Sequence, residues 1–170
     1  MSSYHRVTTE CPPAELRPPL RQGLQTYFEQ HSMGSFEDCL KCCETVSSRA
    51  SSGWLAMVLS GDRDLEYVTA LIVTSEWLIW ARHSDTSGTS VSAARLKNVD
   101  VRPVKPLLSS DFGLEISGYV EGFSGRIRGT IALGPEPAAR QFCDTAAQAV
   151  GEAHPKTART FFGIPMLPRR

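Results

Sequence analysis

Between residues 54 and 133 the chain consists of short apolar segments, each about the length of one strand, which polar turn sequences separate. Segments of this length that are rich in β-branched and aromatic residues are typical of β-strands. The predicted strands cover residues 54–60, 65–74, 77–83, 89–94, 99–104, 113–120 and 126–133. Short strands at this spacing predict an antiparallel barrel or sandwich. We therefore expect an α+β fold built around an antiparallel, bent β-barrel.

Three further segments have helical periodicity. A pair of prolines at residues 18 and 19 can open a helix that ends near residue 30. A second helix is expected over residues 35–47, because Ser35 followed by Asp38 resembles a capping box. The closing helix begins at residue 137 and ends near residues 151–155, where a glycine and a proline interrupt the pattern. Residues 1–17 carry little pattern and are expected to be irregular.

The early and late strands differ in the placement of their apolar residues. In the first and third predicted strands, apolar residues occupy both faces, so these strands need cover on both sides. The strand at 126–133 alternates, with isoleucines on one face and Arg126 and Arg128 on the other, as in a half-solvated sheet. We infer that the N-terminal helices pack on the outer sheet face. The alternative is that this face forms a homodimer interface.

Three segments carry a resemblance to a known family. Residues 70–80 read Ala-Leu-Ile-Val-Thr-Ser-Glu-Trp-Leu-Ile-Trp, residues 94–99 read Ala-Arg-Leu-Lys-Asn-Val, and residues 133–139 read Leu-Gly-Pro-Glu-Pro-Ala-Ala. They resemble a hairpin, the strand that follows it and the entry to the last helix in the bacterial pleckstrin-homology-like (PH-like) family. The resemblance spans residues 54–150. It implies a seven-stranded bent barrel capped at one end by the C-terminal helix, no enzymatic activity and no cofactor. The fold hosts lipid, peptide and protein binding, so it does not select among them.

Three regions follow from this reading. Residues 1–53 form an N-terminal helical extension and linker, residues 54–152 form the PH-like barrel domain, and residues 153–170 form a C-terminal tail. The tail places aromatic and aliphatic residues among prolines and basic residues, which suits docking as an extended arm.

Cys39, Cys42 and Cys43 form the densest group of reactive side chains. The spacing of Cys39 and Cys42 is that of a zinc knuckle or a redox dithiol. A structural zinc needs two more ligands, and the sequence offers no second pair at suitable spacing. On the predicted helix Cys39 and Cys43 share the apolar face, which favours core packing. Cys42 lies at the edge of that face and is the candidate reactive thiol. No metal and no cofactor is expected.

Basic residues gather in the later part of the chain. Arg95 and Lys97, together with Arg126 and Arg128, are a candidate surface for an anion or an acidic partner. The alternative is a solvated outer face. Aromatic residues are not interleaved with these charges, which disfavours a platform for single-stranded nucleic acid. In the turn at 61–64, two aspartates flank one arginine and oppose an anionic lipid headgroup.

Charge and composition narrow the setting. The 18 basic and 18 acidic residues cancel, which argues against a general affinity for nucleic acid. Residues 1–10 have no secretory pattern, and no apolar run reaches the length that spans a bilayer. Five cysteines, an odd number, favour reduced thiols. We expect a cytoplasmic protein without a transmembrane segment, and a peripheral membrane contact stays open.

The sequence contains no nucleophile elbow, phosphate-binding loop, zinc-protease motif or dinucleotide fingerprint. We therefore expect a non-enzymatic binding module whose partner is another protein. Strand addition at an open sheet edge, or a helix laid in a groove, would be the mode of binding. The alternatives are lipid or small-ligand binding at the barrel mouth, and a cysteine-dependent metal or redox protein.

Overall fold

Two antiparallel sheets and two long helices make up the described part of the chain. The computed structural model describes residues 4–49, 66–104 and 112–154. The first sheet has the order β1 (Tyr4–Glu10), β2 (Lys41–Arg49), β3 (Glu66–Val73), β4 (Trp77–Ser84), β5 (Gly88–Arg95). The second has the order β6 (Val99–Val104), β7 (Phe112–Tyr119), β8 (Arg126–Leu133). The helices are α1 (Pro18–His31) and α3 (Pro137–Ala153).

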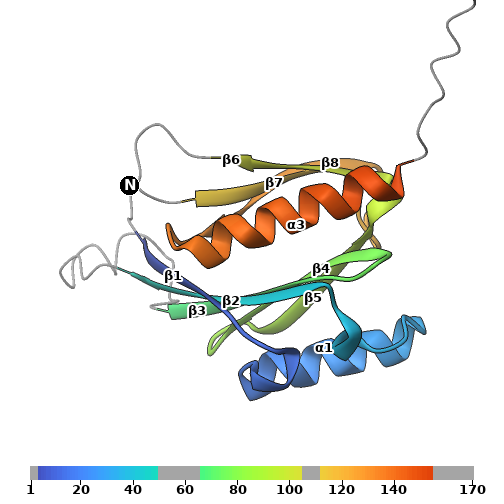
Figure 1. Ribbon diagram of the computed structural model, residues 1–170. Helices are drawn as coiled ribbons and strands as arrows, with labels where there is room; N and C mark the ends of the chain where they lie inside the picture. The colour runs from blue at the N-terminus through green and yellow to red at the C-terminus, as the bar shows by residue number, and fades with distance from the viewer. Residues whose placement is uncertain (1–3, 50–65, 105–111, 155–170) are drawn as a thin grey trace, which may run out of the picture.

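The elements stack in layers. Figure 1 shows α3 between the two sheets and α1 on the opposite face of the five-stranded sheet. Three short 3-10 turns connect the layers: η1 (Pro13–Glu15), η2 (Phe36–Asp38) and η3 (Leu96–Asn98). The turn η3 carries the chain from the five-stranded sheet into the three-stranded one. No helix in the described ranges has the length and apolar character that crossing a membrane requires.

Most of the predicted elements are confirmed. The strands expected from residue 65 onward appear as β3 to β8, and the helices expected from residues 18 and 137 appear as α1 and α3. α3 continues through Gly151 to Ala153. The strand predicted at 54–60, the turn at 61–64 and the docked tail after residue 154 lie outside the described residues.

The strands in the described ranges do not close into a barrel. Among the described strands, hydrogen-bonded pairing stops at β5 on one side and starts again at β6, so the molecule has two separate sheets. The α+β class and the C-terminal helix are as predicted, but the described strands form two sheets instead of the expected bent barrel. One backbone bond, from the Glu121 N–H to the Ala93 carbonyl, links the sheets beside the η3 corner at 2.8 Å.

The prediction of a second helix over residues 35–47 is wrong. Ser35 does cap a turn, since its hydroxyl accepts from the Glu37 N–H at 3.1 Å, but that turn is only η2. The chain then enters β2, which pairs with β1 on one side and β3 on the other. A central strand with both faces covered has apolar residues at adjacent positions, so its sequence lacks the alternation that marks an exposed strand.

The N-terminal residues are also more regular than expected. Residues 4–10, predicted to be irregular, form the edge strand β1, which pairs with β2 along its whole length. The described part of the predicted helical extension, residues 4–49, contains α1 but also supplies two strands of the five-stranded sheet. The predicted boundary at residues 53 and 54 falls between β2 and β3 of that sheet.

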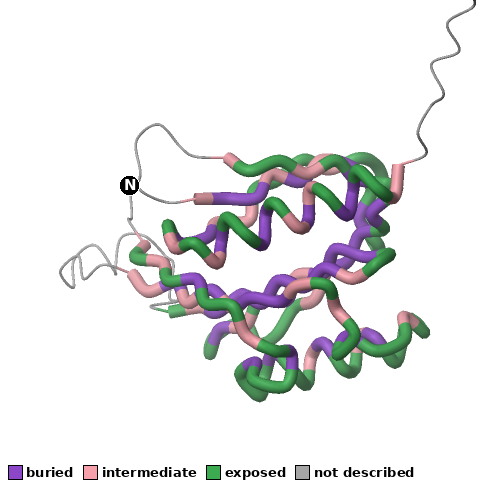
Figure 2. The backbone as a smooth tube through the Cα atoms, viewed as in Figure 1, coloured by how far each residue is buried: buried purple, intermediate pink, exposed green. Residues whose placement is uncertain are grey.

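Two apolar cores hold the layers together, and buried positions follow both interfaces (Figure 2). The inner core lies between the sheets, where Phe142 and Ala146 of α3 are fully buried against Leu71 and Leu114. The outer core lies under α1, where Leu20, Leu24 and Phe28 pack on β3, β4 and β5. Each such buried side chain contributes about 1.5–3 kcal/mol. Of the two N-terminal helices expected on the outer sheet face, α1 packs there, whereas η2 and β2 take the place of the second.

Candidate functional site

The outer face of the three-stranded sheet carries a network of charged side chains. Arg126 and Arg128 of β8 share this face, as their alternation predicts. Arg126 Nη2 lies 3.2 Å from Asp100 Oδ2 on β6, and Arg128 Nη2 lies 3.1 Å from Glu115 Oε2 on β7. Arg102 of β6 holds the other oxygen of the same carboxylate, with Nη2 at 2.6 Å. The sheet thus places every charge of this network beside one of opposite sign.

Glu115 is the centre of this network. Hydrogen bonds from the Arg128 guanidinium, and then from that of Arg102, lower the pKa of its carboxyl group below the ordinary value of glutamic acid. Three arginines face two carboxylates, so the network carries a net charge of about +1 (3 − 2). Ion pairs on a solvated sheet face of this kind contribute little to stability.

The other two predicted basic residues lie elsewhere. Arg95 ends β5, and its guanidinium lies 4.5 Å from the centre of the Trp77 ring in a cation–π contact. Lys97 is exposed on η3. Arg95 therefore belongs to the five-stranded sheet, whereas Arg126 and Arg128 belong to the three-stranded one. The predicted set of four basic residues divides between these locations.

Two aromatic residues beside the network were missed by the sequence analysis. Tyr119 at the end of β7 and Phe123 in the β7–β8 turn are each 58% exposed. Tyr119 lies directly opposite Arg126 in the pairing of β7 with β8. Although aromatic residues are not interleaved with these charges in the sequence, the pairing of β7 with β8 places Tyr119 beside Arg126. The sequence signal was the position of both aromatics around a turn rich in glycine. In the structure, Gly122 and Gly125 of this turn have positive φ.

Strand β8 is an edge strand. Among the described strands, it is hydrogen-bonded to β7 alone. At its far end, the Gly134 N–H donates to Thr8 Oγ1 at 2.8 Å, which connects this end of the sheet to β1. The segment from Arg126 to Thr130 lies away from that connection. The opposite edge, β6, contains Pro103, which lacks an N–H and suits a strand that accepts no further neighbour.

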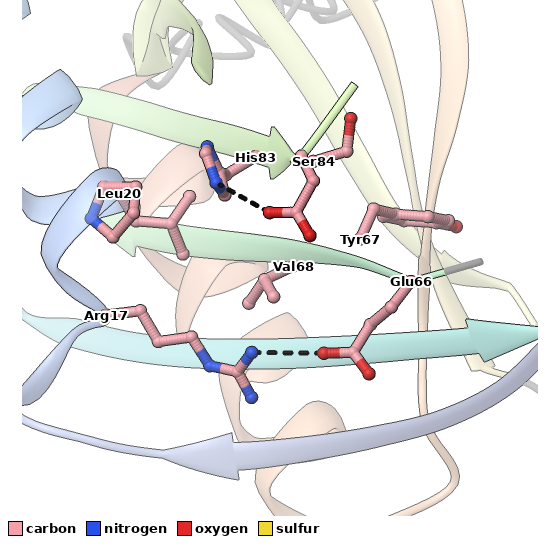
Figure 3. A pocket seen from close by; sticks show the side chains of 9 residues that line it. Arg17, Leu20, Glu66, Tyr67, Val68, His83 and Ser84 are labelled. Atoms are coloured by element: carbon pink, nitrogen blue, oxygen red, sulfur yellow. Dashed lines mark hydrogen bonds and ion pairs between the residues drawn. The ribbon is translucent and has the colours of Figure 1, made fainter. Parts of the chain in front are cut away.

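A cleft of about 390 Å³ opens between α1 and the ends of β3 and β4 (Figure 3). It is lined by Arg17, Pro19, Leu20, Glu66, Tyr67, Val68, His83, Ser84 and Asp85. Arg17 Nη1 lies 3.2 Å from Glu66 Oε1, and Arg17 Nε lies 3.1 Å from Glu44 Oε1. His83 Nδ1 is hydrogen-bonded to Thr89 Oγ1 at 2.8 Å. The main polar groups of the cleft are thus already paired within the protein.

The cysteines do not form the expected helical face. Cys42 and Cys43 are adjacent on β2, so their side chains enter different cores and both are buried. A hydrogen bond to Cys11 and burial both raise the pKa of Cys42, and burial raises that of Cys43. The helix-edge position that singled out Cys42 as the reactive thiol is therefore absent. Within the described ranges, no three His, Cys, Asp or Glu side chains are arranged to hold a metal ion.

Comparison of the chain with models of known protein families, with curated proteins and with solved structures finds no match.

Proposed function

We propose that this protein is a non-enzymatic binding module that takes up an extended segment of a partner protein along the free edge of β8. The proposal includes membership of the PH-like family, whose C-terminal helix and bent antiparallel sheets are compatible with the layers described above. The observation that carries the proposal is an edge of β8 with which no described strand pairs, on a strand that carries two exposed arginines and shares a hairpin with the exposed Tyr119 and Phe123.

An edge strand offers a row of backbone donors and acceptors to another chain. When a peptide adds to such an edge, backbone hydrogen bonds supply affinity and alternate side chains supply specificity. The charges of Arg126 and Arg128 oppose pairing of β8 with a second copy of itself, because like charges would meet. The same charges favour an acidic segment of a different protein.

The side chains around β8 define the chemistry of that segment. Tyrosine and arginine are enriched among the residues that dominate binding at protein interfaces. Arg126 and Arg128 are two positions apart and face the same way, so they match carboxylates at alternate positions of an extended peptide. Phe123 lies beyond the N-terminal end of β8, where it can cover an apolar residue that follows or precedes the acidic pair.

A display library of extended peptides, screened against the full-length protein, tests this function. We expect selected peptides to carry Asp or Glu at alternate positions beside an apolar residue. The double variant Arg126→Ala/Arg128→Ala should lose at least about tenfold in affinity, since each interface arginine of this kind is worth more than about 1 kcal/mol. Amide resonances of β8 should shift on peptide binding.

The matched control is the double variant Arg95→Ala/Lys97→Ala, which removes the same charge away from β8. Equal loss of affinity in both double variants would contradict a specific role for β8. Unchanged affinity in the Arg126→Ala/Arg128→Ala variant would contradict it as well. Selection of no peptide would favour the second candidate below.

The second candidate is binding of a small ligand in the α1 cleft, and the volume of about 390 Å³ favours it. Ligand sites in proteins commonly measure about 300–1,000 Å³. Glu66 and Asp85 in the lining oppose an anionic lipid headgroup, so the fitting ligand is neutral or cationic. A thermal-shift screen with the Tyr67→Ala variant as control tests this candidate. Stabilisation that the variant abolishes would support it.

A further inference from the structure

Cys11 and Cys42 face each other across the start of the five-stranded sheet. In the pairing of β1 with β2, Thr9 lies opposite Glu44 and Glu10 lies opposite Cys43. The next residue, Cys11, continues this register, and its N–H donates to the Cys42 carbonyl oxygen at 3.4 Å. The two cysteines are therefore cross-strand neighbours, although about 30 residues separate them in the sequence.

Their side chains also meet. Both belong to the outer core beneath α1, and the two thiols are hydrogen-bonded to each other. Cys42 is only 3% exposed, whereas Cys11 is partly open to solvent. One thiol of the pair is thus accessible to a small reagent, and the other is held in contact with it from the inside.

The backbone geometry suits a covalent bond between them. Residues directly opposite in an antiparallel pair have Cα atoms about 4.5–5.5 Å apart. A disulfide accepts Cα separations of about 4.4–6.8 Å. Because the two side chains already share one sheet face, joining their sulfur atoms needs little movement of the strands.

We propose that Cys11 and Cys42 form a reversible intramolecular disulfide when hydrogen peroxide oxidises the protein. The Cys11 thiolate attacks one peroxide oxygen: an S–O bond forms, the O–O bond breaks, and the released hydroxide takes up the proton that Cys11 has lost. The Cys42 sulfur then attacks the Cys11 sulfenic acid: the S–S bond forms, the S–O bond breaks, and hydroxide leaves with the Cys42 proton as water. Two thiols and one peroxide give one disulfide and two waters. A small-molecule thiol such as glutathione reverses the change by two exchange steps.

The electrostatic environment assigns the two roles. The hydrogen bond from the Cys42 thiol lowers the pKa of Cys11, and this outweighs burial and the carboxylates of Glu44, Glu15 and Glu10, which act in the opposite direction. A thiolate is the form that attacks a peroxide. Cys11 is accordingly the attacking thiol, and Cys42 is the thiol that completes the disulfide.

The remaining cysteines are less suited to this chemistry. Burial raises the pKa of Cys39, which lies near the pair in the same core. Burial also raises the pKa of Cys143 to about 12, and Cys43 is fully buried beside it in the inner core. The structure therefore distinguishes one pair among five cysteines.

Peroxide titration of the reduced full-length protein, followed by peptide mapping under non-reducing conditions, tests the proposal. We expect a peptide pair linked through Cys11 and Cys42, formed within one chain and removed by glutathione. In the Cys42→Ser variant, a sulfenic acid should persist at Cys11 and react with dimedone. In the Cys11→Ser variant, Cys42 should stay reduced at the peroxide dose that fully oxidises the unmodified protein.

The matched control is Cys39→Ser, which removes the neighbouring thiol and should leave the Cys11–Cys42 disulfide unchanged. If a variant fails to fold, the peptide map of the oxidised wild-type protein still tests the proposal by itself. A disulfide that uses Cys39, a disulfide between two chains, or oxidation that begins at a cysteine other than Cys11 would each overturn the proposal.

Discussion

Thr8 on the first strand and Glu136 at the start of the last helix are hydrogen-bonded, with the Thr8 N–H donating to Glu136 Oε2 at 2.8 Å. The Thr8 hydroxyl accepts from the Gly134 N–H at 2.8 Å and shares a hydrogen bond with the Thr45 hydroxyl at 2.9 Å. Thr8 is only 2% exposed. This one residue connects the N-terminal strand, its neighbour in the sheet and the entry to α3.

We expect Thr8→Val to destabilise the protein although its shape is conserved. The variant leaves the buried Gly134 N–H without its acceptor, which costs about 1–3 kcal/mol. For a chain of this size, each kcal/mol lowers Tm by about 2–4 °C. The control is Thr9→Val, at an exposed position of the same strand. Calorimetry should separate the two variants; equal Tm values would show that the Thr8 hydroxyl adds nothing.

The Glu115 carboxyl should titrate below the ordinary value of about 4.3. Its folded-state pKa is depressed, so its contribution to stability is present above the unfolded-state pKa and is lost as pH falls through the folded-state pKa. Arg128→Ala should raise this pKa most, because the hydrogen bond from Arg128 is the largest cause of the shift. Arg126→Ala, which removes the partner of Asp100, should leave it unchanged. Carboxyl NMR across an acid titration measures both.

A fragment of residues 54–152 should aggregate. It lacks β1, β2 and α1, so it bares the edge of β3 and uncovers the apolar outer face that includes Ile72 and Ile79. Exposed apolar patches and open strand edges both promote association. The control fragment, residues 1–154, keeps every described element and should stay monomeric. Size-exclusion chromatography decides, and a monomeric 54–152 fragment would contradict the observed packing as the source of stability.

The oxidised protein should melt at a higher temperature than the reduced protein. A disulfide between Cys11 and Cys42 closes a loop of about 30 residues, which stabilises a chain by about 3–4 kcal/mol through the unfolded state. That difference corresponds to a rise in Tm of roughly 10 °C. The Cys11→Ser variant should show no such difference between oxidising and reducing conditions. A lower Tm on oxidation would indicate that the bridge strains the strands.

The sequence predicts those elements whose periodicity matches their burial. Phe142 and Ala146 fall on one stripe of the predicted closing helix, and both are fully buried in α3. Leu20, Leu24 and Phe28 recur at helical spacing, and all three are buried on the face of α1 that packs on the five-stranded sheet. In these helices, local spacing and tertiary contact agree.

In β1 and β2 the pattern of apolar and polar residues does not match the pattern of burial. On β1 the aliphatic Val7 is 40% exposed while the polar Thr8 is buried, because hydrogen bonds to distant residues satisfy the hydroxyl. On β2 the adjacent Cys42 and Cys43 are both buried, one in each core. Only the neighbouring strands and both helices explain these positions, and none of them is local in sequence.

Only the part of the candidate site that depends on local alternation could be predicted from the sequence. The alternation of residues in β8 is enough to place Arg126 and Arg128 on one face of the strand. Their partners Asp100 and Glu115 depend on the register of three strands, which the sequence does not specify. The aromatic flank depends on how the β7–β8 turn exposes Phe123.

The strand order has a consequence for synthesis on the ribosome. Each hydrogen-bonded pair of described strands joins strands that follow one another in chain order, so the sheets can form pair by pair as the polypeptide emerges. The hydrogen bonds that join Thr8 to Gly134 and Glu136 cannot form until residue 136 has been translated. Until then Thr8 of the nascent first strand lacks the two partners that join it to the entry of α3.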